Sequence, residues 1–322
     1  MNFKQITNEI SELTILDGEE HAEVYLLQLF PGVILGINYV NIHRITGNVK
    51  DAAAMEALRI NYCFEGRCEV KLVDGRYVYV HNNALCIEDH EPQYNFHYPL
   101  GFYKGLQIFI DKSLRFKQQP EPLALFGVNL KTLLDTYCNT NQTFIQIASE
   151  QFDEKALELM AVWENESLTY EQKVQKIRFL LCYLFYYLIY QEAVNPEKSY
   201  NACTLSHSQY MIALDCEHKI MQDLSRKITV EALAAHYKVS PSSLKNYFSG
   251  VYGCSISEYT QSMRMKQAKQ LLETTDLSVM HIAASVGYEN QSKFSAVFKK
   301  HIGYAPLEYK RIYNLKRNEE PT

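Results

Sequence analysis

The chain has 322 residues and a formal net charge of −5, with 47% hydrophobic and 21% charged residues, and this length accommodates two domains. Its most apolar stretch, residues 179–190, has 12 residues, whereas a membrane-spanning helix needs about 20, so the sequence predicts no membrane span. The segment after Met1 is polar, unlike an export signal, and the eight cysteines show no metal-ligand spacing. We therefore expect a cytoplasmic protein with reduced thiols.

Residues 1–125 contain short runs of β-branched and aromatic residues separated by turn residues. Asp74-Gly75, between two runs that alternate apolar and polar residues, is a strong hairpin signal. Successive strands of this kind predict a small antiparallel barrel or sandwich. The predicted strands are 24–29, 33–37, 58–64, 67–73, 76–80, 84–87 and 103–110.

Two cysteines flank a second predicted turn, Glu65-Gly66. If that turn has two residues, Cys63 and Cys68 form a non-hydrogen-bonded cross-strand pair with Cα atoms about 4.5 Å apart. This separation permits a strained and therefore reversible disulfide, which would make the domain redox-responsive. Two buried, reduced thiols are the preferred interpretation, and one extra loop residue would put the side chains out of register.

The histidines of this half do not form the tight His-x-His pair expected of a metal site in a small β-barrel. His90 and His97 lie seven residues apart near acidic residues, and a structural or solvent-facing role is favoured over metal binding. No set of nucleophile and base is visible either, so the sequence predicts no catalytic residues, no metal site and no cofactor. The histidines considered are His21, His43, His81, His90 and His97.

Residues 126–194 are predicted to be helical, with helices over 126–137, 153–164 and 171–192. The last helix carries apolar residues at alternating steps of three and four, the pattern of a two-helix coiled-coil seam, so we expect a dimerisation segment. The alternative is that this helix belongs entirely to the core of its own chain. Polar residues 195–208 are predicted to be a linker. The stripe consists of Val174, Ile177, Leu181, Leu184 and Leu188.

The C-terminal part, residues 209–322, contains one pattern twice, over residues 229–248 and 278–298. Each copy has a polar cap, a short helix with an apolar triplet (residues 233–235 or 282–284), a tight turn, a second cap and a second helix. This is the pattern of a helix-turn-helix, which holds its second helix in a DNA major groove. Two copies suggest that one chain reads two grooves.

Residues at the predicted helix ends support this interpretation. Ser255 and Glu258 form a capping box that opens a joining helix ending at about Thr274. Gly287 lies in the second turn, where a left-handed residue is needed. Lys238 occupies the equivalent position in the first turn, at a cost of about 1 kcal/mol. The other predicted N-caps are Thr229, Ser240, Ser278 and Asn290.

The block from Lys227 to Arg311 resembles the DNA-binding domain of the AraC/XylS family of bacterial transcription regulators, over about a quarter of the chain. The resemblance implies a cupin-like effector-binding barrel in the N-terminal half, a homodimer, and RNA polymerase as a partner, with activation more common than repression. It is carried by Leu233-Ala234, Ser240-Pro241, Leu244, Phe248, Gly253, Tyr259, Arg264, Ala268, Leu271-Leu272, Ile282-Ala283, Gly287-Tyr288, Phe294, Phe298-Lys299, Gly303, Pro306 and Tyr309.

The resemblance also implies which side chains face the bases. Asn and Gln can pair with adenine edges and Lys with guanine. Asn246 and Ala296 depart from the family, whose members often carry Arg there, and this departure affects base preference. The implied DNA-binding residues are Ser242, Lys245 and Asn246 in the first unit, and Gln291, Ser292, Lys293 and Ala296 in the second.

The distribution of charge agrees with this division. Residues 201–322 contain 15 Lys and Arg against 11 Asp and Glu, whereas residues 1–200 contain 17 against 26. A basic C-terminal part on an acidic remainder fits a DNA-binding domain joined to a sensing domain. Because the basic excess is modest, binding should depend on dimerisation or base contacts and not on phosphate attraction alone.

We therefore predict an α+β protein that is not an enzyme. It has a cupin-like antiparallel β-barrel, a helical dimerisation segment and an all-α domain with two helix-turn-helix units. The predicted function is sequence-specific regulation of transcription from double-stranded DNA, in response to an unidentified small molecule. The alternatives are a cupin-type metal enzyme, or a redox-sensing regulator, with the same DNA-binding tail.

Overall fold

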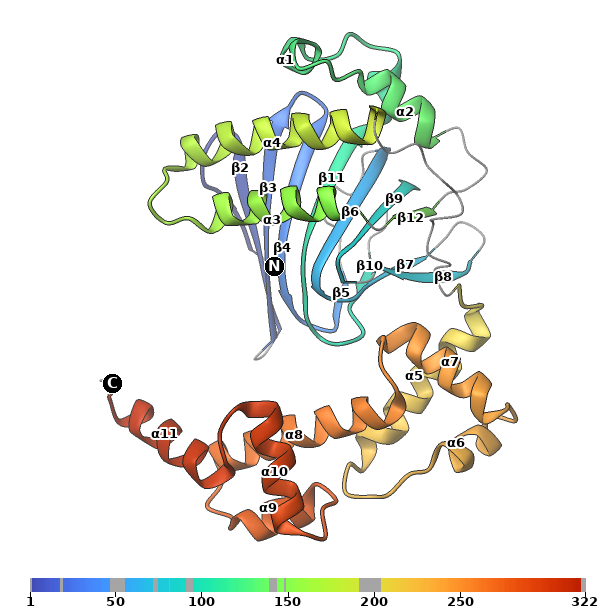
Figure 1. The fold of residues 1–322 in the computed structure, drawn as a ribbon, viewed down its shortest axis with the longest axis vertical. Coiled ribbons are helices and arrows are strands. Elements are labelled where there is room, and N and C mark those ends of the chain that lie inside the picture. The colour runs from blue at the N-terminus through green and yellow to red at the C-terminus, as the bar shows by residue number, and fades with distance from the viewer. Residues whose placement is uncertain are drawn as a thin grey trace. The chain divides into compact units, whose positions relative to one another are not determined.

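The computed structural model describes residues 2–17, 20–46, 56–71, 75–80, 82–90, 95–138, 144–147, 149–190 and 204–319. The chain divides into two compact units, Met1–Ser206 and His207–Thr322. The first unit combines strands and helices and the second is helical, so the predicted α+β class is confirmed (Figure 1). No helix in the described ranges is both long and apolar enough to cross a membrane.

The N-terminal unit is built on one eight-stranded sheet in the order β1-β2-β3-β4-β11-β6-β9-β12. Two further pairs, β10–β5 and β7–β8, are separate. The pairings among the described residues leave β1 and β12 as edges and do not close the sheet into a barrel. The strands are Asn2–Gln5 (β1), Ile10–Asp17 (β2), Glu20–Phe30 (β3), Val33–Asn41 (β4), Arg44–Thr46 (β5), Ala57–Gly66 (β6), Cys68–Lys71 (β7), Tyr77–Val80 (β8), Ala84–His90 (β9), Asn95–His97 (β10), Tyr103–Asp111 (β11) and Phe144–Ile147 (β12).

The two faces of this sheet differ in chemistry. On β6, Leu58, Ile60 and Tyr62 belong to the large apolar core shared with the helices, and α3 and α4 lie across this face (Figure 1). Because successive strand residues point to opposite faces, Arg59 and Asn61 lie on the other face, where both are buried. The helical layer thus covers an apolar face, and the opposite face holds buried polar groups.

The predicted antiparallel pairing of the two runs beside Asp74-Gly75 is confirmed, since β7 and β8 pair with Cys68 opposite Val80. Residues 72–74 lie outside the described residues. The predicted turn at Glu65-Gly66 is wrong. Strand β6 continues to Gly66 and is paired on both sides, with β11 and β9, so no edge of β6 is left for β7. Cys63 therefore lies opposite Ala84, not Cys68, and both thiols are free and buried.

The helices of the first unit are Glu121–Leu125 (α1), Leu130–Cys138 (α2), Glu150–Glu164 (α3) and Tyr170–Tyr190 (α4), after a 3₁₀ turn at Lys112–Arg115. The predicted start of a helix at 126 is wrong because Gly127 has φ +73°, which ends α1 and separates it from α2. Helix α3 begins three residues before its predicted start. Ser149 accepts a hydrogen bond from the backbone N–H of Phe152 at 3.2 Å there.

The stripe predicted to join two subunits lies inside the first unit. Its five residues are at most 2% exposed in a single chain and belong to the core between α4 and the sheet. This burial supports the alternative that the sequence left open, so the stripe is not a free coiled-coil seam. The solvent-facing side of α4 is aromatic instead and presents Phe179, Tyr183, Tyr186 and Tyr190.

The C-terminal unit contains seven helices among its described residues. The first begins at His207, within the segment predicted as linker, and residues 195–203 of that segment lie outside the described residues. The helices are His207–Gln222 (α5), Val230–His236 (α6), Pro241–Tyr252 (α7), Ile256–Thr274 (α8), Val279–Ser285 (α9), Gln291–Ile302 (α10) and Pro306–Glu319 (α11).

Candidate nucleic-acid interface

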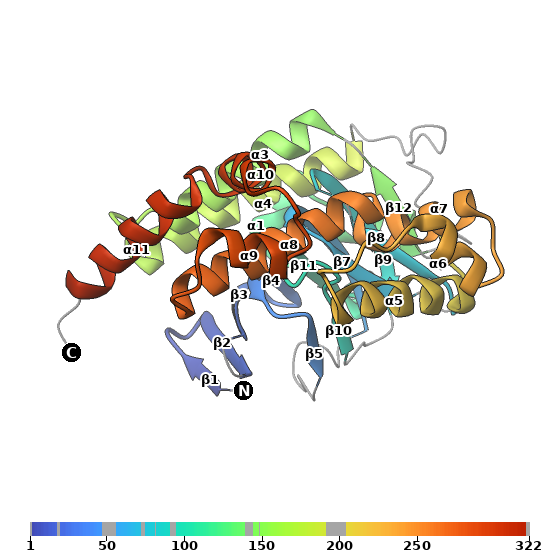
Figure 2. The ribbon, with the colours of Figure 1, turned by 90° about the horizontal axis from the view of Figure 1, so that it is seen from below.

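Two helix-turn-helix units, α6–α7 and α9–α10, lie at the two ends of α8 (Figure 1, Figure 2). All four predicted N-caps are confirmed, and each side-chain oxygen accepts a hydrogen bond from a backbone N–H three residues on, at 3.0–3.3 Å. Ser255 and Glu258 form the predicted capping box at the start of α8. These bonds satisfy donors that a helix leaves unpaired at its start.

The second helix of each unit is held by its apolar side. Leu244 and Phe248 of α7 are fully buried, as are Phe294 and Phe298 of α10. Since these residues are four apart, each helix is fixed along one face and leaves the opposite face to solvent. All seven side chains predicted to contact DNA are exposed on α7 and α10. Their contact with bases stays a prediction.

Arg264 of α8 contacts both the loop before α6 and the second helix-turn-helix unit. Its Nε donates a hydrogen bond to the carbonyl oxygen of Leu224 at 2.8 Å, and its Nη2 donates to that of Arg226 at 3.1 Å. Its guanidinium carbon lies 5.9 Å from the ring centroid of Tyr288 in the second unit, a distance at which a cation is attracted to the ring. In the sequence, Arg264 is named only among the residues that carry the family resemblance. This role was missed because it depends on carbonyl groups 38–40 residues away.

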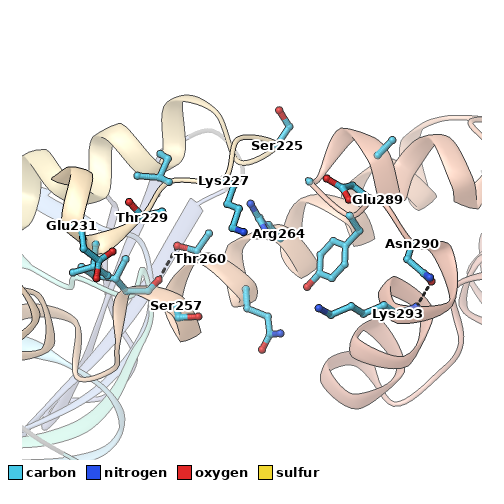
Figure 3. Close-up of a pocket in the computed structure, with 17 residues that line it drawn as sticks. Ser225, Lys227, Thr229, Glu231, Ser257, Thr260, Arg264, Glu289, Asn290 and Lys293 are labelled. Atoms are coloured by element: carbon cyan, nitrogen blue, oxygen red, sulfur yellow. Dashed lines mark hydrogen bonds between the residues drawn. The ribbon is translucent and has the colours of Figure 1, made fainter.

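A cleft of about 930 Å³ lies beside Arg264, between the two helix-turn-helix units of the C-terminal unit (Figure 3). Its lining includes the cations Lys227, Arg264 and Lys293 and the acids Glu231 and Glu289. Asn290, the cap of α10, also lines it. The cleft therefore has mixed charge with a small positive excess and adjoins one of the predicted DNA-contacting lysines.

The histidines form no metal centre within the described ranges, where no group of three or more His, Cys, Asp and Glu residues is arranged to hold an ion. His97 Nδ1 lies 2.9 Å from a carboxylate oxygen of Glu69. The side chain of His90 lies outside the described residues. Glu88, one of the acids near these histidines in the sequence, is paired with Arg59.

Comparison with known proteins gives matches to the C-terminal unit. A family model described as a helix-turn-helix domain matches residues 233–312. The melibiose operon regulatory protein of Escherichia coli (strain K12) is 26% identical over 102 residues, which are 32% of this chain and 34% of that protein. The arabinose operon regulatory protein of Salmonella typhimurium (strain LT2) is 36% identical over 81 residues, 25% of this chain and 29% of that protein.

Among solved structures, the DNA-binding domain of AdpA in complex with a target DNA is 25% identical, with a TM-score of 0.32. The match covers 34% of this chain and 97% of that domain. The chain spans about a third of the length of the curated relatives described above.

Proposed function

Because the chain belongs, through its C-terminal domain, to the AraC/XylS family of transcription regulators, we propose that it binds double-stranded DNA sequence-specifically and regulates transcription. The observation that carries the proposal is the pairing of two solvent-exposed helices, α7 and α10, in one unit joined by α8. Each helix enters a major groove. We further propose that it acts in the cytoplasm, as an activator that contacts RNA polymerase, and not as an enzyme.

The chemistry of the exposed side chains supports base reading by both helices. Lys245 and Lys293 donate to guanine, and Asn246 and Gln291 form paired hydrogen bonds with adenine. Ala296 has no donor or acceptor and suits the thymine methyl group. Ser242 and Ser292 suit either a base edge or a phosphate.

The cleft beside Arg264 supports a contact with the DNA backbone. Successive major grooves on one DNA face are about 34 Å apart, and α8, with 19 residues at ~1.5 Å each, has a comparable length. The sugar-phosphate backbone between the two grooves then faces the cleft, where Lys227 and Lys293 supply positive charge.

We propose that the N-terminal unit is a cupin-like domain that senses a small molecule. Its antiparallel sheet has one face covered by helices and a buried polar face opposite. The family resemblance supplies the link between such a domain and an effector. A sensor of redox state is less well supported because Cys63 and Cys68 are not cross-strand partners.

We also propose that two chains dimerise through the outer face of α4. Phe179 and Tyr190 are 60% and 57% exposed, and Tyr183 and Tyr186 are 38% and 41% exposed. Their spacing of four, three and four residues places all four on one side of the helix. Aromatic residues are enriched at protein interfaces, whereas solvent-facing helix positions are usually polar.

The proposal is tested by selecting bound fragments from random DNA with the full-length protein and then footprinting one selected site. We expect protection in two major grooves about one helical turn apart for each subunit, on one DNA face. Selection that enriches no sequence, or protection of a single groove for each subunit, would contradict it.

A further inference from the structure

The middle of α8 joins two hydrophobic cores. In the first half of the helix, Tyr259 packs against Phe248 of α7, with ring centroids 5.4 Å apart. In the second half, Met265 belongs to the core that also contains Phe294 of α10. Residues 260–264 lie between these two positions, and none of them is buried. The relative orientation of the two cores therefore depends here on little more than one helical turn, and helices are rarely straight.

Arg264 lies at this junction and ties it to the loop before α6. Its guanidinium donates hydrogen bonds to the carbonyl oxygens of Leu224 and Arg226. The loop is itself ordered, because Leu224 is buried and the carboxylate of Asp223 accepts a hydrogen bond from the backbone N–H of Ser225 at 3.0 Å. A guanidinium is planar and presents its donors in a fixed fork, so two bonds to one loop fix both the distance and the direction of the contact.

The turn of the second helix-turn-helix unit reaches the same guanidinium. A Cβ at Gly287 would lie 2.9 Å from Arg264 Nη2 and 2.6 Å from the carbonyl oxygen of Ser225. The backbone at Gly287 thus touches both the arginine and the loop, and it can do so because glycine has no side chain. The ring of Tyr288 also lies close to the guanidinium. Three segments, the loop, α8 and the turn, therefore meet at Arg264 (Figure 3).

The geometry of DNA makes the relative position of α7 and α10 decisive. Two major-groove contacts one turn apart are separated by about 34–36 Å and about 10–10.5 base pairs. One added base pair therefore moves one contact by about 3.4 Å and rotates it by about 35° around the DNA axis. A hydrogen bond spans only about 3 Å. A protein with a rigid junction consequently accepts one spacing, whereas a protein with a loose junction accepts several.

We propose that Arg264 is a positioning residue that holds α7 and α10 in one relative orientation, and so determines how many base pairs may separate the two grooves that the chain reads. This inference rests on the proposed reading of two major grooves and assigns the residue that sets their spacing. Arg264 acts through the loop before α6 and the turn at Gly287, and not through contact with a base.

A phosphate contact is the competing role, because Arg264 also lines the cleft proposed to face the DNA backbone. The two roles respond differently to substitution by lysine. Lysine binds phosphate as a point charge, so Arg264→Lys would preserve a phosphate contact. Lysine lacks the planar fork, so the same variant would loosen the junction between the loop, α8 and the turn.

The test measures binding of the full-length protein to spacing variants of one selected and footprinted site. One or two base pairs are added or removed between the two grooves that one subunit protects, and fluorescence anisotropy gives the affinities. For the unchanged protein, we expect a change of one base pair to weaken binding about tenfold or more, as loss of base contacts by one helix requires. For Arg264→Lys, we expect this ratio of affinities to fall at least about fivefold.

The ratio is measured within one sample, so partial unfolding, which lowers every apparent affinity equally, leaves it unchanged. Tyr288→Leu removes the ring beside the guanidinium and should relax the spacing preference in the same direction. Tyr288→Phe keeps that ring and should retain the preference. Lys266→Gln is the matched control for lost charge, because Lys266 is exposed on α8 two residues beyond Arg264, and it should retain the preference as well.

Arg264→Lys decides the matter, and Tyr288→Leu decides it if the arginine variant does not fold. Retention of the spacing preference in the deciding variant overturns the inference. Equal binding of all spacings by the unchanged protein, or loss of the preference in Tyr288→Phe or Lys266→Gln, overturns it too. None of these results touches the proposed function, because a selected site with two protected grooves is still bound. Selection that yields no such site contradicts the proposed function itself.

Discussion

Lys238 and Gly287 occupy equivalent positions in the turns of the two helix-turn-helix units, with φ angles of +55° and +78°. Gly287 also lies against another segment of the chain, since a Cβ there would approach the carbonyl oxygen of Ser225 to 2.6 Å. Lys238, in contrast, is exposed. The second turn is therefore constrained by conformation and by contact with the loop before α6.

Gly287→Ala should lower the free energy of unfolding of the C-terminal unit by more than about 2 kcal/mol. The left-handed conformation alone costs a residue with a Cβ about 1–2 kcal/mol, and the clash with Ser225 adds to this. Gly303→Ala is the matched control, because Gly303 has φ +90° and nothing within 4 Å of the added Cβ. Urea denaturation that gives equal losses for the two variants would contradict the close contact.

Lys238→Gly should raise the free energy of unfolding by up to about 1 kcal/mol. Glycine relieves the left-handed strain, but part of the gain is offset by its greater freedom in the unfolded chain. Lys238→Ala, which retains a Cβ, should not stabilise the protein. The same denaturation experiment measures both, and a stabilisation by Ala equal to that by Gly would attribute the effect to loss of the lysine charge.

Lys245→Ala and Lys293→Ala should each weaken binding to a selected DNA site by about 1–3 kcal/mol if the lysines read bases. This loss of affinity should appear only at sites that contain the base pair read by the lysine. At sites where that base pair is changed, the variant and the unchanged protein should bind equally. A uniform loss across sequences, with a shallower salt dependence, would assign the lysines to phosphate contacts. Lys176→Ala is the control for lost surface charge, because Lys176 is exposed on α4 of the N-terminal unit. Fluorescence anisotropy at several salt concentrations measures the affinities to be compared.

Replacing both Leu181 and Leu188 by Glu should unfold the N-terminal unit and not merely separate subunits. The two side chains are 0% and 1% exposed within one chain, and burying unpaired carboxylates is strongly unfavourable. Replacing both Tyr183 and Tyr186 by Glu should instead leave the circular dichroism spectrum unchanged and yield monomers. Sedimentation that shows an intact dimer in the tyrosine variant would contradict pairing through the outer face of α4.

The thiols of Cys63 and Cys68 should resist alkylation in the folded protein. Burial raises the pKa of both, that of Cys68 to about 12, against about 8.5 for a free thiol. A raised pKa means less thiolate, the reactive form, so both thiols stay almost entirely protonated at pH 8. Iodoacetamide labelling with peptide mapping should show reaction only after urea unfolding, and rapid labelling of native Cys68 would contradict this.

The sequence predicted those elements whose signals are local. The caps Ser240 and Asn290, the capping box of α8 and the pairing of β7 with β8 each depend on residues a few positions apart, and all three features are found in the structure. The misplaced hairpin at Glu65-Gly66 has a different cause. Distant segments of the chain determine which strands pair with β6. The alternation of apolar and polar residues within β6 does not identify those strands.

Helix α4 shows a second limit of sequence patterns. Its apolar residues surround much of the helix, so a heptad stripe through Leu181 and a buried core face produce the same spacing. Burial against the sheet distinguishes the two. The contacts of Arg264 were missed for a related reason, since they require segments far apart in the sequence to meet.

The two outward-facing helices of the C-terminal unit are unlike in sequence. Helix α7 presents Ser242, Lys245 and Asn246, and α10 presents Gln291, Ser292 and Lys293. A chain that reads DNA with two unlike helices in fixed order along α8 requires an asymmetric site, so that site has a direction. If the site is inverted while the protein stays in place, α7 meets the bases that α10 reads, and α10 meets those that α7 reads. The orientation of the site therefore sets the orientation of a bound protein relative to the start of transcription. Inverting the site at an unchanged distance would reverse that orientation.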